Sequence, residues 1–208
     1  MRVYKIIEKT YVEGPGSRFC IWVQGCNQRC KGCFATELWD YDKGYEIEIY
    51  EIIKLINNVK DEIDGITFLG GEPFDKAKDL YKIAEYIHSL NKNVITFTGY
   101  KYEQIKSSKN QDFENLLNYT DLLIDGKFKV ELLDFSRPLV GSSNQRFIFL
   151  TNRISKEEIK TYKNRFELRL DGKGKMDFNG MGDTKILMKF LNKLSPKIQE
   201  RNDYKDEK

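Results

Sequence analysis

The chain has 208 residues, of which 40% are apolar and 32% charged, and its formal net charge is +3. This length and composition predict one globular domain with a substantial core. The lysines are scattered among acids without a basic stripe, which argues against nucleic acid as a partner. The first ten residues lack the apolar stretch of a signal peptide, and no apolar run reaches the length of a bilayer span, so we expect a cytoplasmic protein.

In chain order, apolar strand-like segments alternate with helical periodicity. Residues 19–24 (FCIWVQ) predict the first strand. The later predicted strands are GITFL from residue 65, NVITFT at 93–98 and DLLID at 121–125. Helical apolar spacing occurs at 49, 52, 53, 56 and 59, then at 80, 83, 84, 87 and 90, and helical sequence resumes between the last two strands to about residue 118. This β-α-β-α-β order with short connections indicates a parallel sheet with helical crossovers.

Four segments with the composition of ligand-binding loops follow these strands directly. They are GCNQRCKGC at 25–33, GGEP at 70–73, TGYK at 98–101 and DGKF at 125–128. Loops at the carboxyl ends of parallel strands gather at one edge of the sheet, where α/β proteins bind their ligands. The sequence therefore predicts that all four loops meet in one site.

The pattern changes beyond about residue 150. Ser155 and Glu158 form a capping box for a short helix, and FELRLDGKGKMDF predicts a hairpin that turns at 171–174. A final helix is predicted from Ile186, Leu187, Phe190, Leu191 and Leu194. The predicted divisions are a main domain at 1–150, an extension (helix, hairpin, helix) at 151–194 and a charged tail, expected to be disordered, at 195–208.

All four cysteines of the chain lie within residues 14–34. Cys26, Cys30 and Cys33 have three and then two residues between them, whereas Cys20 lies on the predicted strand and is assigned to core packing. A reducing cytoplasm disfavours disulfides and leaves metal binding as the better explanation. Structural zinc commonly takes four Cys or His ligands in two separated pairs, and no fourth ligand follows here at a usable spacing.

A [4Fe–4S] cluster suits this spacing better than zinc. Thiolates are its usual ligands, and a short loop can hold three of its four irons. The fourth iron is then open to a substrate, which points to catalysis instead of electron carriage. The one histidine of the chain, His88, excludes imidazole-rich metal sites, and we expect it to be a solvated structural residue on the flank of its helix. A non-catalytic iron–sulfur or zinc protein is the alternative.

These residues also resemble a known family. The cysteines match the Cx3Cx2C signature of radical S-adenosylmethionine (SAM) enzymes, and GPGSRFCIWVQGCNQRCKGCFATELW is similar to the opening of the glycyl-radical-enzyme activating enzymes. TFLGGEP, TGY, DLLIDGKF and RPLVGSSNQR are similar, in order and spacing, to segments of the activases of anaerobic (class III) ribonucleotide reductase. The resemblance covers about residues 4–150. Gly32 stands where many radical SAM enzymes carry an aromatic residue, a departure that is typical of these activases.

The resemblance implies an α/β fold, a partial and laterally open (βα) barrel, with a small C-terminal α+β extension. It implies one [4Fe–4S] cluster held by Cys26, Cys30 and Cys33, with SAM bound at the open iron. The SAM contacts that it implies are Gly32, Cys33, Phe34, Gly70, Gly71, Glu72, Thr98, Asp125, Lys127 and Ser142. It also places Gly14, Gly16 and Arg18 in a loop at the mouth of the site, near a protein substrate.

The implied reaction is reductive cleavage of SAM to methionine and a 5′-deoxyadenosyl radical, which takes a hydrogen atom from a backbone glycine of a partner enzyme. The expected partners are the large subunit of anaerobic ribonucleotide reductase and a small electron donor such as flavodoxin or ferredoxin. The segment after about residue 150 departs from the compact activases. It leaves open another glycyl-radical enzyme, a peptide substrate, or small-molecule chemistry of the deazapurine synthase type.

Overall fold

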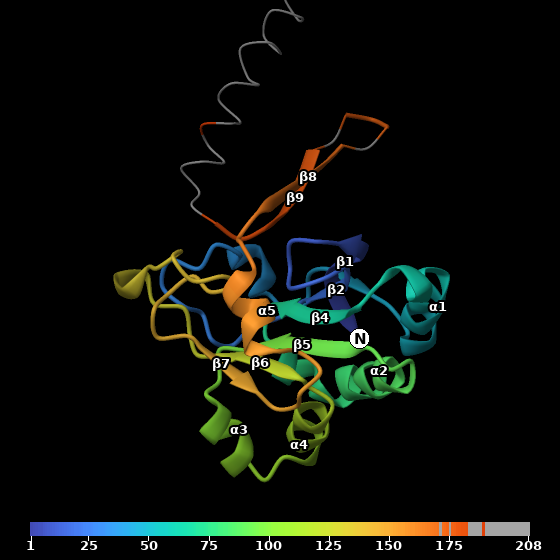
Figure 1. Ribbon diagram of the computed structural model, residues 1–208, viewed down its shortest axis with the longest axis horizontal. Coiled ribbons are helices and arrows are strands. Elements are labelled where there is room, and N and C mark those ends of the chain that lie inside the picture. The colour runs from blue at the N-terminus through green and yellow to red at the C-terminus, as the bar shows by residue number, and fades with distance from the viewer. Residues whose placement is uncertain (171, 175, 183–188, 190–208) are drawn as a thin grey trace, which may run out of the picture.

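The computed structural model describes residues 1–170, 172–174, 176–182 and 189 (Figure 1). The strands are β1 (Arg2–Thr10), β2 (Arg18–Val23), β3 (Tyr45–Glu46), β4 (Gly65–Gly70), β5 (Asn93–Phe97), β6 (Leu122–Asp125), β7 (Arg146–Phe149), β8 (Phe166–Leu170) and β9 (Met176–Gly180). The helices are α1 (Ile49–Val59), α2 (Ala77–Ser89), α3 (Tyr102–Ser107), α4 (Gln111–Asn118) and α5 (Lys156–Thr161). Short 3₁₀ turns are η1 (Thr36–Leu38), η2 (Lys60–Glu62), η3 (Pro73–Lys76) and η4 (Val130–Leu132). None of the helices in these ranges combines the length and the apolarity that crossing a membrane requires.

Seven strands form one mixed sheet in the order β3-β1-β2-β4-β5-β6-β7. Strands β2, β4, β5 and β6 run parallel, with crossovers through the helices, as the sequence predicts. Strands β1 and β7 flank this parallel core in antiparallel pairing. The sheet stays open between its edge strands β3 and β7, so the described chain forms no closed barrel.

Helices α1 and α2 bury their apolar stripes in the main core against the sheet. Helix α1 starts with a capping box between Glu48 and Glu51, and it buries Ile52 and Ile56. Helix α2 buries Leu80, Ile83, Ala84 and Ile87, the stripe that the sequence predicts. These residues pack with Ile66 and Phe68 of β4. Each fully buried aliphatic or aromatic side chain contributes about 1.5–3 kcal/mol, so this face anchors the strands whose ends carry the site.

The chain after β7 forms the predicted short helix and hairpin. Ser155 and Glu158 make the capping box of α5, and β8 pairs with β9 as a separate two-stranded sheet. One of the contacts of the hairpin with the main domain is the ion pair with Lys5 of β1, whose Nζ lies 3.0 Å from Asp177 Oδ2. The residues that define the predicted last helix, and the predicted tail, lie outside the described residues.

Candidate functional site

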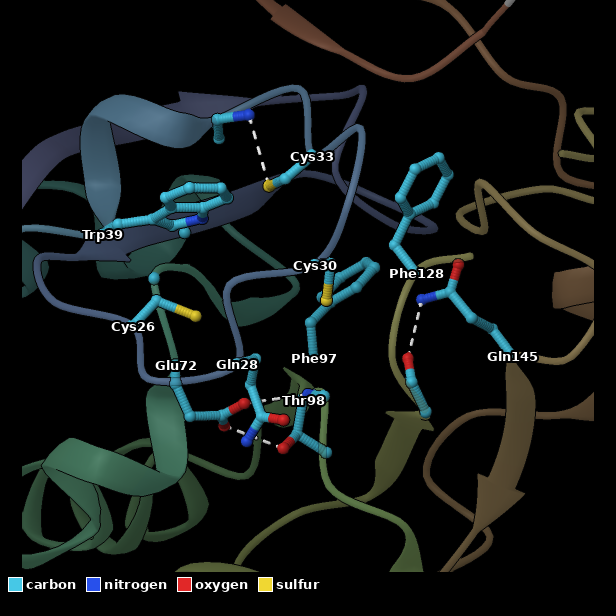
Figure 2. A pocket seen from close by; sticks show the side chains of 15 residues that line it. Cys26, Gln28, Cys30, Cys33, Trp39, Glu72, Phe97, Thr98, Phe128 and Gln145 are labelled. Carbon is cyan, nitrogen blue, oxygen red and sulfur yellow. Dashed lines mark hydrogen bonds between the residues drawn. The ribbon is translucent and has the colours of Figure 1, made fainter. Parts of the chain in front are cut away.

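A pocket at the carboxyl edge of the sheet brings the four predicted loops together (Figure 2). Its lining includes Cys26, Cys30 and Cys33 after β2, Gly70, Gly71 and Glu72 after β4, Thr98 and Gly99 after β5, and Gly126 and Phe128 after β6. The prediction that these strand-end segments meet in one place is therefore confirmed. The common cause is the parallel register, in which Val23 pairs with Gly70 and the neighbouring strands end nearby.

The cysteine loop is held in place by hydrogen bonds of its own backbone. Gly25 N donates to Leu38 O at 2.9 Å, and Cys26 N donates to Trp39 O at 3.3 Å. Gln24, just before the loop, holds the segment that follows the cysteines. Its buried side chain donates through Nε2 to Glu37 O at 3.1 Å and to Asp40 O at 2.6 Å. The loop is thus shaped by the protein itself.

The three thiols of the pocket are partly buried and unoxidised, as is fully buried Cys20. Burial raises the pKa of Cys26 to about 11. Burial, followed by the nearby Cys33, also raises the pKa of Cys30. Burial therefore favours the protonated form of Cys26 and Cys30, and metal binding has to displace those protons.

The spacing of the sulfurs in space bears on the choice of metal. Across the described residues, no three His, Cys, Asp or Glu side chains converge closely enough to hold a single metal ion. A tetrahedral zinc ion needs such convergence, whereas a [4Fe–4S] cluster spreads its thiolate ligands over different irons. Three soft donors line one pocket, and thiolates are the usual ligands of a [4Fe–4S] cluster.

Gly70 and Gly71 bring β4 into direct contact with the cysteine loop. Gly70 has a φ of 103°, which favours glycine. A Cβ added to Gly71 would overlap the carbonyl oxygen of Gly25. Hydrogen bonds join the two segments at the same place, from Gly71 N to Val23 O at 2.8 Å and from Glu72 N to Gly25 O at 2.9 Å. The two glycines are therefore required by this close approach.

The carboxylate of Glu72 is buried beside the pocket and largely satisfied by the protein. Its Oε1 accepts from Phe74 N at 3.0 Å and from Thr98 Oγ1 at 2.7 Å, and its Oε2 accepts from Gly99 N at 2.8 Å. Burial raises the pKa of Glu72 to about 7, although these three donors oppose the shift. A carboxylate has about four acceptor positions, so one position on Oε2 is open to a ligand.

Two of the expected SAM contacts lie outside the pocket lining and hold the surrounding loops. Asp125 is fully buried, and its Oδ1 accepts from Arg146 Nε at 2.9 Å while its Oδ2 accepts from Tyr102 N at 2.7 Å. Ser142 is also fully buried, and its Oγ accepts from Lys129 N at 3.2 Å. Both side chains hold loops of the protein in this arrangement, and their contact with SAM stays a prediction.

The remaining expected contacts lie around the rim. Lys127 lines a neighbouring hollow of about 260 Å³ instead of the pocket itself. Phe34 is 63% exposed, and its ring lies 5.6 Å from that of Phe128. Gly32 lies against Val130, where an added Cβ would come within 3.0 Å. The end of the cysteine loop therefore packs on the segment after β6, and only Cys33 of residues 32–34 lines the pocket.

Gly14, Gly16 and Arg18 lie at the amino edge of the sheet, where β2 begins, and the pocket lies at the opposite edge. Arg18 is fully buried, and its Nε donates to Thr67 Oγ1 at 3.1 Å. Its other nitrogens donate to Asn93 Oδ1 and to the Ile66 carbonyl. The expectation that Arg18 shapes the mouth of the site is therefore wrong, because a buried guanidinium at this edge reaches neither the pocket nor a partner's surface.

His88 has the structural role that the sequence predicts, but its side chain is less solvated than expected. Its side chain is 17% exposed, and its Nε2 lies 2.9 Å from Oδ2 of the fully buried Asp121. The same carboxylate accepts from Val94 N at 2.7 Å and from Thr151 Oγ1 at 2.5 Å. This cluster joins α2, β5, β6 and the segment after β7, so His88 has a structural role.

Some pocket residues were not singled out by the sequence. They are Gln28, Ala35, Trp39, Phe97 and Gln145. Gln145 holds the last loop, because its Nε2 donates to Gly126 O at 3.3 Å and its Oε1 accepts from Gly141 N at 2.9 Å. The alternation of the third predicted strand could have assigned Phe97 to the pocket face. No sequence signal marks Trp39, whose place depends on how the loop returns.

Comparison with known proteins gives the class of this pocket. A family described as "4Fe-4S single cluster domain" matches residues 12–148. A solved structure of QueE from Escherichia coli matches with a TM-score of 0.38 and 16% identity, over 47% of this chain and 51% of that one. The likeness to QueE is too weak to support an argument, whereas the family match includes all three pocket cysteines.

Curated relatives share one name, anaerobic ribonucleoside-triphosphate reductase-activating protein. The relative from enterobacteria phage T4 is 28% identical, over 76% of this chain and 100% of its own length. The relative from Salmonella typhi is 30% identical over 70% and 96%, and that from Vibrio cholerae is 31% identical over 64% and 88%. The chain therefore belongs to the 4Fe-4S single cluster domain family and, within it, to the anaerobic ribonucleoside-triphosphate reductase-activating proteins.

Proposed function

We propose that the chain holds one [4Fe–4S] cluster on Cys26, Cys30 and Cys33 and uses it with SAM to activate an anaerobic ribonucleoside-triphosphate reductase. The observation that carries the proposal is the meeting of three free thiols with the Gly-Gly-Glu turn in one pocket. The names of the relatives supply the partner. When bound, the reduced cluster would supply the electron that cleaves SAM into methionine and a 5′-deoxyadenosyl radical, the species that takes a hydrogen atom from a glycine of the partner.

In this proposal the residues of the chain place SAM and keep water away from it. The open acceptor position of Glu72 would take a hydrogen bond from the SAM ammonium, and the backbone of Gly70 and Gly71 would border the same group. Thr98 acts through Glu72, because its hydroxyl already donates to that carboxylate. The aromatic rings of Phe97 and Phe128 line the pocket and would exclude water from the reacting atoms. Hydrogen-atom abstraction requires no general base, which agrees with a pocket that lacks histidine.

The partners proposed for this site are the glycyl-radical enzyme and a small electron-transfer protein such as flavodoxin or ferredoxin. The sheet stays open between its edge strands β3 and β7, which supports the first, because an open sheet leaves a side for a glycine-bearing segment to enter. Charge supports the second. Residues 27–34, 98–102 and 126–130 carry only cations, namely Arg29, Lys31, Lys101, Lys127 and Lys129, all of them exposed. SAM is itself a cation, so a basic rim serves an acidic protein better than it serves SAM.

The test is anaerobic reconstitution of the full chain with iron and sulfide, reduction, and addition of SAM. We expect 5′-deoxyadenosine to form, and a glycyl doublet to appear in the electron paramagnetic resonance (EPR) spectrum once the reductase subunit is added. If no 5′-deoxyadenosine forms at a fully assembled cluster, the radical chemistry is excluded. If 5′-deoxyadenosine forms but no doublet appears, the partner is wrong and the chemistry stands.

A further inference from the structure

Trp39 has a buried hydrogen-bond donor with no acceptor. Its Nε1 has no hydrogen-bond partner in the described structure, although an indole N–H can only donate. Trp39 lines the cysteine pocket, and Figure 2 shows its indole between Cys26 and Cys33. Buried donors are normally paired, so an unpaired donor at a ligand site indicates that the ligand supplies the acceptor.

The backbone around Trp39 is fixed in this position. Trp39 N donates to Thr36 O at 3.1 Å, and Trp39 O accepts from Cys26 N at 3.3 Å. The Gln24 amide holds the carbonyls on both sides, those of Glu37 and Asp40. Moving the residue away from the pocket would therefore break the loop that carries the cysteines.

Two side-chain acceptors of the pocket lining serve other donors, and neither of them accepts from the Trp39 Nε1–H. Glu72 accepts from Phe74 N, Thr98 Oγ1 and Gly99 N, and Gln145 Oε1 accepts from Gly141 N and Ser142 N. The sulfur atoms of a cluster held by the cysteine loop would add acceptors of strong negative charge to the pocket that Trp39 lines. Sulfur atoms of iron–sulfur clusters accept N–H hydrogen bonds, and such bonds tune the reduction potential.

We propose that the Trp39 Nε1–H donates a hydrogen bond to a sulfur of the [4Fe–4S] cluster and thereby raises its reduction potential. The inference rests on the proposed function, in which Cys26, Cys30 and Cys33 hold that cluster. Reduction adds negative charge that is shared by the sulfurs, so a fixed N–H dipole stabilises the reduced form more than the oxidised form. Trp39 is thus a positioning residue that makes the cluster easier to reduce.

The first test is the midpoint potential of the reconstituted Trp39→Phe variant, which keeps an aromatic ring and lacks the donor. We expect its reduction equilibrium to become about tenfold less favourable, a shift of about 59 mV for one electron. Trp22→Phe is the matched control. Trp22 is the other tryptophan of the chain and packs beneath Lys5, whose Nζ lies 4.9 Å from its ring, with Ile7 and Leu69 around it. Equal potentials in wild type and Trp39→Phe would overturn the proposal.

A second measurement does not depend on the folding of the Trp39 variant. In the Trp22→Phe background Trp39 is the only tryptophan. Labelling that protein with ¹⁵N-indole and reducing its cluster should give pulsed EPR couplings from one indole nitrogen and from one proton that exchanges in D₂O. Absence of both couplings at an assembled cluster overturns the hydrogen bond and leaves the proposed function intact. A wild-type chain that assembles no cluster overturns the proposed function, and this inference with it.

Discussion

The two edges of the parallel sheet treat buried polar groups differently. At the amino edge, Arg18 donates to three acceptors and Asp121 accepts from Val94 N, Thr151 and His88, so these charges are matched by the protein. At the carboxyl edge, three free thiols line one pocket together with Trp39, whose N–H has no hydrogen-bond partner in the described structure. The amino edge is completed by the chain itself and stabilises the fold, whereas the carboxyl edge keeps donors and ligands available for a cofactor.

The largest effect expected from this contrast is on the cluster. Replacing Cys30 by alanine should abolish cluster assembly and 5′-deoxyadenosine formation, because only two thiols of the pocket remain. Cys20 lies on β2, the strand that leads into the cysteine loop, and it is fully buried outside the pocket lining. Cys20→Ala should therefore keep both cluster assembly and 5′-deoxyadenosine formation. Iron and sulfide content and the absorbance near 400 nm check this. Loss of the cluster in Cys20→Ala as well would mean that the pocket thiols alone do not define the site.

Changing Arg18 should affect the fold and spare the cluster. Arg18→Met leaves the Ile66 carbonyl and the Asn93 side chain without their buried donor, and each such group costs about 1–3 kcal/mol. We expect a loss of about 3 kcal/mol in the free energy of unfolding, measured by urea denaturation. The folded fraction should still assemble the cluster. A variant of unchanged stability that lacks the cluster would reverse the roles of the two edges.

Glu13 lies in the connection from β1 to β2 and gives the amino edge a pH dependence. Its side chain is buried, which raises its pKa from 4.5 to about 7, although the side chain of Asn179 and the backbone of Gly180 donate to it. The unfolded chain releases this proton near pH 4.5 and the folded chain near pH 7, so the stabilisation is fully present below pH 4.5 and is lost as the pH rises through 7. At 1.36 kcal/mol per unit, the rise of the pKa from 4.5 to about 7 corresponds to a loss of roughly 3–4 kcal/mol.

The check for Glu13 is urea unfolding of wild type and Glu13→Gln at pH 5 and pH 8. The difference between the two pH values should be smaller in the variant, because glutamine does not titrate. Lys5 and Glu167 also shift the pKa of Glu13, and both are unchanged in the variant. Glu72, whose own pKa is raised by burial, is unchanged as well. If the two proteins show equal pH dependence, Glu13 is not the group responsible.

Gly71→Ala should disturb the carboxyl edge by a smaller amount. Its Cβ would overlap the Gly25 carbonyl, and overpacking of this kind costs about 1–3 kcal/mol. We expect lower cluster occupancy together with a modest loss of stability. Gly172→Ala is the control, because no heavy atom lies within 4 Å of its added Cβ. A normal cluster in Gly71→Ala would show that the cysteine loop tolerates displacement by β4.

The smallest expected effect concerns the electron donor. Reversing Lys127 and Lys129 to glutamate should lower the rate of cluster reduction by flavodoxin several-fold at low salt, because rim charges act mainly on association. Lys54 and Lys82 are exposed on α1 and α2 and serve as the control. Reversing both to glutamate changes the net charge by the same amount, and the cluster of this variant should be reduced at the wild-type rate. The difference should shrink at high ionic strength. If the clusters of the two double variants are reduced at equal rates, the electron donor docks elsewhere on the protein.

The sequence predicts the parallel core and the meeting of its loops, because periodicity and strand order are local properties. It does not reveal β1, since charged Arg2, Lys5, Glu8 and Lys9 interrupt the apolar alternation. The charge on Lys5 finds its partner, Asp177, 172 residues away in the hairpin. Antiparallel strands of mixed composition become recognisable only when such distant partners are known.

The site shows the same limit. The cysteines and the Gly-Gly-Glu turn carry their chemistry in residue type and spacing, and they meet as predicted. In sequence, Asp125 and Arg18 look like equally good site residues. In the fold, Asp125 accepts a hydrogen bond from Arg146, and Arg18 donates one to Asn93. Trp39 is the converse case. No sequence signal marks it, and its N–H lacks a partner only because the fold buries it. Which polar groups remain available to a ligand is decided by the whole fold.

The Gln24 bridge has a consequence for the lifetime of the protein. Its amide joins both limbs of the cysteine loop by bonds that involve no sulfur and no iron. In zinc fingers, by contrast, losing the metal means unfolding. Here, damage to an oxygen-sensitive cofactor would leave a folded chain with its thiols still arranged, so a molecule stripped by air could be refilled by the cell instead of being degraded and made again.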